Sequence, residues 1–267
     1  VKHFLNVETD RTGIHYKRIS NRFPSLGYIL LCMSAPLSIL QKVSDELLNR
    51  PCILCGQPCL GPTDICEPCQ EDLPWHQSGC LRCGLALPNN ATYCGHCLTQ
   101  KLYFDHCLCA FNYRFPINKL ILSFKNNEKL IYGKVLAHLF ADRLKGHPSL
   151  PDRLIPVPIH WITRRLRGFN QSDLISTDLG RRLAIPVINR ACKRTRQTQQ
   201  QKSLNLVDRR KNVGNAFEAN IRLDHLPIGV VDDVVTSMAT TNSLSRALKK
   251  AGAEKITILC LARAPLP

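Results

Sequence analysis

The amino-acid sequence predicts an α/β fold, built on a doubly wound parallel sheet, for the part of the chain that follows residue 100. There, short apolar runs that suit buried strands alternate with stretches whose apolar residues have helical spacing. The preceding fifty residues are instead rich in cysteine, which indicates a small separate module. At 267 residues, 44% of them hydrophobic, the chain is long enough to bury a full core in more than one domain.

The segment before residue 51 gives the weakest signals, and we expect a poorly defined extension over residues 1–50. Met33 is followed by a stretch that suits a short helix, so translation starting at Met33 is one expectation for this region. Residues 26–40 are apolar and follow basic residues, which faintly resembles a signal sequence. The run is too short to span a bilayer comfortably, and we expect no stable membrane insertion.

Eight cysteines form four C-x-x-C pairs, and each half of this region encloses ten residues between its two pairs. Thiols paired in this way are typical of metal binding in a reducing compartment rather than of a disulfide framework, so we expect a cytoplasmic protein. Four thiolates make the closed tetrahedral site that structural Zn²⁺ prefers. We therefore expect a double zinc-knuckle module over residues 51–100. Its ligands would be Cys52, Cys55, Cys66 and Cys69 for one Zn²⁺ and Cys80, Cys83, Cys94 and Cys97 for the other.

The pairing of the four knuckles is open from the residues alone. The short repeat favours sequential pairing, and an interleaved arrangement, first knuckle with third, is the alternative. Cys59, His76 and His96 are spare candidates that could replace a ligand. The other cysteines are expected in the hydrophobic core as small apolar side chains. They are Cys32, Cys107, Cys109, Cys192 and Cys260.

Strands and helices alternate through the predicted α/β domain, residues 101–267. Amphipathic stretches that stop at Gly146 and at Gly252 carry the termination signals of helices. The expected strands are 107–114, 153–158, 185–189, 228–231 and 255–262, the last of which closes the sheet. The expected helices are 117–126, 130–145, 171–183 and the stretch from 239 to 252. A ligand crevice should lie at the carboxyl ends of the strands.

Residues 228–241, which read IGVVDDVVTSMATT, are the most informative stretch of the chain. Asp232 and Asp233 follow an apolar strand, so both carboxylates should face the crevice, where they can hold Mg²⁺ or accept from sugar hydroxyls. The next turn brings hydroxyls and backbone amides to a helix start, which suits a phosphate. The phosphate-binding candidates are Thr236, Ser237, Met238, Ala239 and Thr240. A plainer alternative, a strand followed by a threonine-capped helix, leaves the paired aspartates unexplained.

Two further polar stretches are expected beside this crevice. Arg164, Arg165 and Arg167 lie in a glycine-containing turn before a helix, and each guanidinium can engage two oxygens of a pyrophosphate or another polyanion. Residues 193–217 are polar, basic and weakly periodic, which is typical of a mobile segment that folds over a ligand. The alternative for both stretches is a solvated surface loop.

The 228–241 stretch resembles the phosphoribosyl-pyrophosphate (PRPP) motif of type I phosphoribosyltransferases. The residues that match in register are Asp232, Asp233, Thr236, Ser237 and Thr240. Met238 departs from the motif because it occupies the position of a glycine. Glycine allows positive φ there and lets the backbone approach the phosphate closely. Met238 therefore either points away from a working site or marks a damaged one.

Residues 52–264 as a whole resemble the ComF family, including its DNA-utilisation branch often called GntX. Besides the cysteine pairs and the aspartates, the chain carries P-V-P at 156–158, R-G-F-N-Q at 167–171 and T-x-x-Q-x-x-L at 198–204, in the family's order. The match continues through Arg210, Asn212, Ala216 and Phe217. The resemblance implies paired zinc knuckles before a phosphoribosyltransferase-type domain. It also implies a part in natural competence, with PRPP and Mg²⁺ as ligands and DNA-uptake proteins as partners.

The charge of the chain agrees with a phosphate-bearing partner, since 36 Lys and Arg face 20 Asp and Glu and the net charge is +16. Such charge attracts PRPP and single-stranded DNA alike. Only 6% of residues are aromatic, which argues against recognition by base stacking. Two functions stay open. One is phosphoribosyl transfer to an unknown acceptor, with Asp232 and Asp233 as the catalytic residues. The other is a catalytically inactive adaptor of the same fold that binds nucleotide or single-stranded DNA.

Overall fold

The computed structural model describes residues 50–59, 61–87, 91–126, 129–195 and 216–266, together with two short strands near the N-terminus. Residues 1–49 and 50–267 form two separate compact units. In the first, β1 (Glu8–Thr9) pairs with β2 (His15–Tyr16) in antiparallel fashion. Met33, Cys32 and the expected short helix lie outside the described residues.

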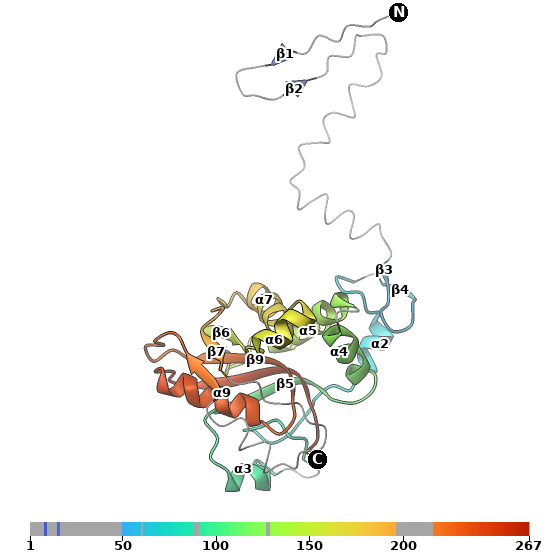
Figure 1. Ribbon diagram of the computed structural model, residues 1–267. Coiled ribbons are helices and arrows are strands. Elements are labelled where there is room, and N and C mark those ends of the chain that lie inside the picture. The colour runs from blue at the N-terminus through green and yellow to red at the C-terminus, as the bar shows by residue number, and fades with distance from the viewer. Residues whose placement is uncertain are drawn as a thin grey trace, which may run out of the picture. The chain divides into compact units, whose positions relative to one another are not determined.

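A four-stranded parallel sheet forms the centre of the second unit (Figure 1). Its strands, in spatial order, are β5 (His106–Asn112), β10 (Ile256–Arg263), β9 (Ile228–Val235) and β6 (Arg153–Pro156). All eight residues of β10 are buried, because this strand lies between β5 and β9 instead of closing the sheet at an edge. The expected parallel sheet is confirmed, with the last strand in its interior.

Helices cover both faces of the sheet, which confirms the doubly wound arrangement. The helices are α4 (Ile117–Lys125), α5 (Leu130–Leu144), α7 (Gln171–Leu183) and α9 (Ala239–Lys250). The side chains of Leu259 and Leu261 join the core cluster that contains α4, α5 and α7. Ile258 and Cys260 join a second cluster that contains residues of α9. Successive side chains of a strand point to opposite faces of the sheet, so β10 contributes to one hydrophobic core on each face.

Three local expectations differ from the structure. The strand expected over 228–231 continues through both aspartates to Val235, because β10 still pairs with it there. Residues 185–189 form only an isolated parallel bridge, between Val187 and Leu154, instead of a full strand. The arginine-rich stretch is a short helix, α6 (Trp161–Arg167), and not a turn; Gly168 ends it with φ 82°.

The cysteine-rich region contains β3 (Arg50–Pro51), β4 (Pro58–Cys59), α2 (Glu67–Glu71) and α3 (Gly95–Thr99). Its middle, residues 74–76, lies along the edge strand β5. Trp75 forms an antiparallel bridge with Phe111, and the His76 amide donates to the Ala110 carbonyl over 2.9 Å. The module therefore covers backbone groups that an edge strand would otherwise leave open.

A small antiparallel pair, β7 (Cys192–Arg194) and β8 (Phe217–Ala219), stands outside the main sheet. Most of the segment expected to fold over a ligand, residues 196–215, lies between these strands and outside the described residues. In the part of the chain that is described, no helix is both long and apolar enough to cross a membrane.

Candidate functional site

Asp232 and Asp233 lie where the shorter strand β6 has already ended, since the last residue pair between β6 and β9 is Pro156 with Val231. The hydroxyl of Ser172, at the start of α7, donates to Asp232 Oδ1 over 3.4 Å. Lys125, the last residue of α4, forms an ion pair of 2.9 Å with Asp233 Oδ2. The two carboxylates are thus met by different helices.

The pKa of Asp232 is raised to about 7, first by burial and then by the negative charge of Asp233. The ammonium of Lys125, the Asp233 amide and the Ser172 hydroxyl act in the opposite direction and only partly offset these two causes. Two adjacent carboxylates disfavour each other's ionised form unless a positive charge lies between them. The pair is therefore suited to take up a cation or the donor groups of a ligand.

A chain of hydrogen bonds links Arg167 to the aspartates. Arg167 Nη1 donates to Gln171 Oε1 over 2.8 Å, and Gln171 Nε2 donates to the carbonyl oxygen of Lys125 over 3.2 Å. Lys125 in turn holds Asp233. Asn170 begins α7, and its side chain accepts from the amide of Ser172. The R-G-F-N-Q-S stretch therefore supports the aspartates through contacts that the sequence alone did not reveal.

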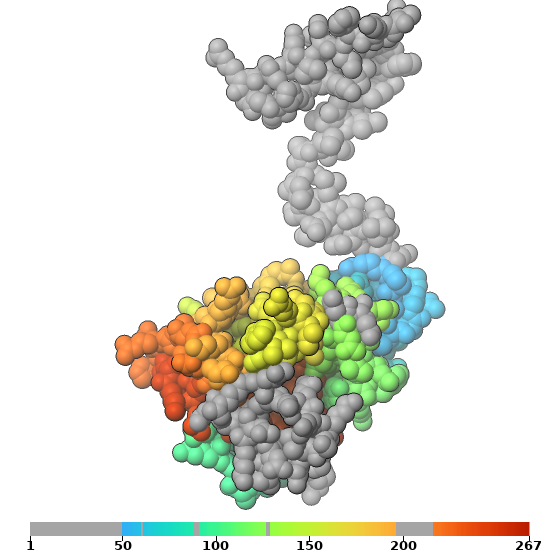
Figure 2. Space-filling view, viewed as in Figure 1, coloured from blue at the N-terminus to red at the C-terminus, as the bar shows by residue number. Residues whose placement is uncertain are grey.

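Arg164 and Arg165 are less closely tied to the aspartates. Arg164 is exposed and forms an ion pair of 3.6 Å with Asp173. Arg165 is exposed as well, and no residue of the short helix α6 is buried. In Figure 2, α6 is the yellow region that protrudes from the surface. Arg167 is linked to Asp233 through Gln171 and Lys125. Arg164 is linked to Asp232 through the ion pair with Asp173 and the hydrogen bonds of Asn170 and Ser172.

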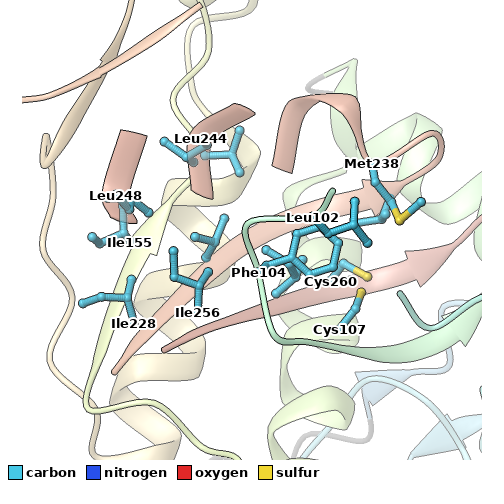
Figure 3. Close-up of a cluster of buried hydrophobic side chains, with 14 of the residues drawn as sticks. Leu102, Phe104, Cys107, Ile155, Ile228, Met238, Leu244, Leu248, Ile256 and Cys260 are labelled. Atoms are coloured by element: carbon cyan, nitrogen blue, oxygen red, sulfur yellow. The ribbon is translucent and has the colours of Figure 1, made fainter. Parts of the chain in front are cut away.

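Met238 adopts the conformation that a glycine would take at this position. It is the N-cap of α9, with φ 63° and ψ 0° in the left-handed region. Its side chain is only 3% exposed and lies in the same core cluster as Leu102 and Cys260 (Figure 3). Positive φ costs free energy at a residue other than glycine. Burial of the apolar Met238 side chain offsets part of that cost. The side chain is not turned out to solvent.

The start of α9 has no side-chain cap, so the alternative of a threonine-capped helix is wrong. Met238 holds the N-cap position, and Thr241, the third residue of the helix, donates its hydroxyl to the carbonyl oxygen of Met238 over 3.1 Å. The hydroxyls of Thr236, Ser237 and Thr240 form no hydrogen bond with other described residues. Uncapped amides and three hydroxyls thus meet at the start of a helix, close in sequence to the aspartates.

Arg194, in β7, brings a third element to the aspartates. The negative charge of Asp232 acts to raise its pKa, although burial lowers that pKa by more. The expected family residues Thr198, Gln201 and Leu204 lie outside the described residues.

Eight cysteine thiols gather into two groups of four, in sequential order. Within each group all Sγ atoms lie within 4.8 Å of one another. Cys55 and Cys66 are separated by 3.5 Å between Sγ atoms, and Cys83 and Cys94 by 3.6 Å. The groups are Cys52, Cys55, Cys66 and Cys69, and Cys80, Cys83, Cys94 and Cys97. Neither Cys59 nor a histidine belongs to a group among the described residues.

One thiol of each group has a lowered pKa. Burial opposes the ionised form, but backbone amides that donate to the sulfur outweigh it, so the pKa falls to about 6 for Cys52 and to about 7 for Cys80. Thiolates are the form that binds metal. Four thiols at this spacing, with donors already directed at a thiolate, fit a structural Zn²⁺ in each group.

Known proteins place these features in a family. Residues 43–98 match the model of the double zinc ribbon domain. The chain is 35% identical over 228 residues to competence protein F of Haemophilus influenzae, covering 82% of this chain and 99% of that protein. It is 32% identical over 223 residues to DNA utilization protein YhgH of Escherichia coli strain K12, covering 79% and 96%. The chain belongs to the ComF family.

Solved structures add little to this ComF assignment. A purine phosphoribosyltransferase from Pyrococcus horikoshii is 21% identical and has a TM-score of 0.30, covering 48% of this chain and 70% of that one. An adenine phosphoribosyltransferase from Leishmania tarentolae is 10% identical and has a TM-score of 0.29, covering 58% and 91%. Scores this low support no conclusion about the site of this ComF protein.

Sequence reasoning missed three residues of the ComF site. Lys125 gave no signal beyond its place at the end of a helix, and Arg194 was one basic residue among many. Ser172 stood beside the R-G-F-N-Q motif, so its position at the start of a helix could have suggested a role. The roles expected for the aspartates, the hydroxyl residues and the arginines stay predictions.

Proposed function

We propose that the chain is a ComF protein of DNA uptake or utilisation whose α/β domain binds PRPP with Mg²⁺ and can transfer its phosphoribosyl group. The observation that carries the proposal is the carboxylate pair Asp232 and Asp233, held beyond the end of β6 beside the start of α7 and followed by the uncapped start of α9. The printed names of the relatives, a competence protein and a DNA utilization protein, support the biological setting.

In this proposal the aspartates bind the ribose end of PRPP and the loop before α9 binds its 5′-phosphate. Lys125 neutralises Asp233 before the ligand arrives. Mg²⁺, when bound, would neutralise pyrophosphate charge. Arg167, the last residue of α6, is connected to this end of the site through Gln171 and Lys125. Catalysis would come from stabilising the leaving group's charge rather than from a nucleophilic side chain.

Calorimetry tests the binding step directly. PRPP with Mg²⁺ is titrated into the zinc-loaded full chain and into Asp232→Asn and Asp233→Asn, which we expect to lose binding. Asp178→Asn is the matched control, because Asp178 pairs with the surface residue Arg181 on α7. Binding that survives in both site variants would reject the assignment.

The raised pKa of Asp232 gives the same titration a second readout. Because this carboxyl is partly protonated near pH 7, binding of the cationic Mg²⁺ should release a proton from it. Titrations at pH 6.5 in two buffers of different ionisation enthalpy should therefore give different apparent enthalpies. The difference should vanish at pH 8.5, where Asp232 is already ionised.

Met238→Gly separates backbone strain from side-chain burial. Positive φ is already adopted, so we expect no gain in PRPP affinity from glycine. Loss of the buried side chain should cost about 2–5 kcal/mol of stability, offset by about 1–3 kcal/mol from relief of strain. A tenfold gain in affinity would mean that the loop of the natural protein is held in an unproductive conformation.

The adaptor function is favoured by one observation, the presence of Met238 at the glycine position. Binding of PRPP without release of pyrophosphate, across a panel of purine and pyrimidine bases, would support it. Single-stranded DNA binding is tested by anisotropy with an oligo-dT across a salt series. Arg164→Ala with Arg165→Ala should reduce the slope of log K against log salt by about 1.4. Arg181→Ala is the surface control, and an unchanged slope in the double variant would leave α6 without a role in DNA binding.

A further inference from the structure

A third group of cysteines lies in the sheet and shares no ligand with either zinc ribbon. Cys107 and Cys109 are on β5 and Cys260 is on β10, and the three Sγ atoms lie within 4.8 Å of one another. Cys109 and Cys260 are direct partners in the parallel register. All three are buried. Two adjacent strands therefore hold the thiols in fixed positions.

The spacing of these thiols equals that of the zinc ribbons. Cys260 Sγ donates to Cys109 Sγ over 3.3 Å, and the Sγ atoms of Cys107 and Cys109 are 3.6 Å apart. The corresponding distances within the two ribbons are 3.5 and 3.6 Å. Figure 3 shows the sulfur atoms of Cys107 and Cys260 directed toward each other from their strands. Cysteines that only fill a core have no need to converge through their sulfur atoms.

Two neighbouring residues, Gly84 and Arg263, shape the surroundings of the three thiols. Gly84, with φ 66°, lies directly over the cluster, and a Cβ at that position would come within 2.7 Å of Cys109 Sγ. The backbone of the second ribbon thus approaches the sulfur atoms as only glycine allows. Arg263 is 2% exposed, and its Nη2 has no hydrogen-bond partner among the described residues.

Arg263 lies beside the cluster. It follows Cys260 by three residues on β10, and its Nε donates to the carbonyl oxygen of Cys83, the neighbour of Gly84. A buried guanidinium of this kind is stabilised by a nearby anion. The cluster therefore has a cation in place to balance a thiolate.

We propose that Cys107, Cys109 and Cys260 form a third metal site, which takes one thiophilic monovalent ion, Cu⁺, through three sulfur ligands. Three thiol ligands suit Cu⁺, whereas structural Zn²⁺ takes four. Each thiol that becomes a thiolate releases its proton to solvent as the ion binds. Cu⁺ held by two thiolates and one thiol carries one negative charge in total, which Arg263 offsets.

The test uses the full chain with zinc in both ribbons, loaded with copper in two ways. One sample is produced in copper-supplemented medium, and the other is titrated with Cu⁺ under anaerobic conditions. Both are then dialysed against bathocuproine disulfonate, which removes weakly held Cu⁺. We expect one copper to be retained beside two zinc ions, with the ultraviolet absorption of sulfur-to-copper charge transfer.

Variants decide whether the copper is in this cluster. Cys260→Ala should lower the retained copper about tenfold or more, while keeping an apolar side chain in the core and both zinc ions. Cys192→Ala is the matched control, because Cys192 is also buried but lies outside the cluster. Three results would overturn the proposal. They are no retained copper by either route, equal copper in Cys260→Ala, and copper that enters only as zinc leaves.

Discussion

The two zinc ribbons repeat the same cysteine spacing, yet they lie on opposite faces of the sheet. Cys52 of the first ribbon joins the core cluster of α4 and α5, whereas the four cysteines of the second join the cluster of α9 and Met238. The chain passes from one face to the other at residues 74–76, along β5. In Figure 1, α2 lies beside α4, whereas α3 lies well apart from both.

The ribbons also differ in the exposure of their cysteines and in their contacts with the α/β domain. All four thiols of the second are buried, while Cys55 of the first is exposed. Arg263 Nε donates to the carbonyl oxygen of Cys83, and its Nη1 donates to the carbonyl oxygens of Val235 and Thr236 over 3.0 and 2.7 Å. Arg263 therefore ties the second ribbon to the segment that joins β9 to α9. A repeated metal motif can thus serve two different structural purposes.

The largest effect is expected from Cys83→Ser, which opens the buried ribbon. Loss of its zinc should cost about 5 kcal/mol or more, because binding energy at a structural site is folding energy and the site lies within the core of α9. Thermal unfolding and zinc content measure the result, which should be about one zinc per chain and a broad, early transition. A variant as stable as the natural protein would show that the second ribbon is not part of the core.

Cys55→Ser makes the matching change in the exposed ribbon. One zinc should again be lost, but at a cost of about 3 kcal/mol, since Cys55 faces solvent and less apolar surface depends on it. The freed apolar residues of this ribbon should lower solubility. Chelator-induced zinc release from the natural protein should be biphasic, with the fast phase missing in Cys55→Ser. If the fast phase persists in Cys55→Ser and is missing in Cys83→Ser, the second ribbon releases its zinc first, which contradicts the prediction.

Arg263→Lys tests the link between the second ribbon and the loop. Lysine keeps the charge but lacks the fork that reaches four backbone carbonyls, so about 2 kcal/mol of stability should be lost. Hydrogen exchange should increase at the amides of residues 235–238. Arg50→Lys is the control, because Arg50 makes an ion pair with Asp64 on the surface of the first ribbon. Equal hydrogen exchange in Arg263→Lys and Arg50→Lys would show that Arg263 does not stabilise residues 235–238.

Regular elements were predictable because hydrophobic spacing and end signals are local. The bounds of α7 were predicted residue for residue, since Asn170 begins the helix and its apolar period is clear. The positive φ of Met238 was foreseeable from the glycine position of the motif, whereas the burial of its side chain was not. A motif constrains the backbone, but the environment of a side chain depends on distant residues.

The site and the placement of the ribbons depend on contacts between residues far apart in the sequence. Lys125 and Asp233 come from different helix and strand units, and nothing local in either stretch indicates their ion pair. The repeated cysteine spacing was informative about ligands, yet it made the ribbons look equivalent. Their opposite faces follow from the bridge of Trp75 to Phe111, which no spacing rule predicts.

The smallest effect concerns Asp232, which lies on the strand that leads into the loop held by Arg263. Its pKa of about 7 in the folded chain lies above the ordinary value of 3.8. Between these values the folded state binds a proton that the unfolded state has lost, so this carboxyl lowers stability as pH rises from about 4 to about 7. Asp232→Asn should be more stable than the natural protein at pH 7.5 and equal to it at pH 4. A shift of this size corresponds to roughly 4 kcal/mol, and we expect about 1 kcal/mol because Asp232 is only part-buried and solvent screens its charge. Magnesium-free thermal unfolding across this range measures the difference. Cys55→Ser should keep the pH profile of the natural protein, because no described hydrogen bond or ion pair joins the first ribbon to Asp232. A changed profile in this variant would mean that the first ribbon is coupled to Asp232.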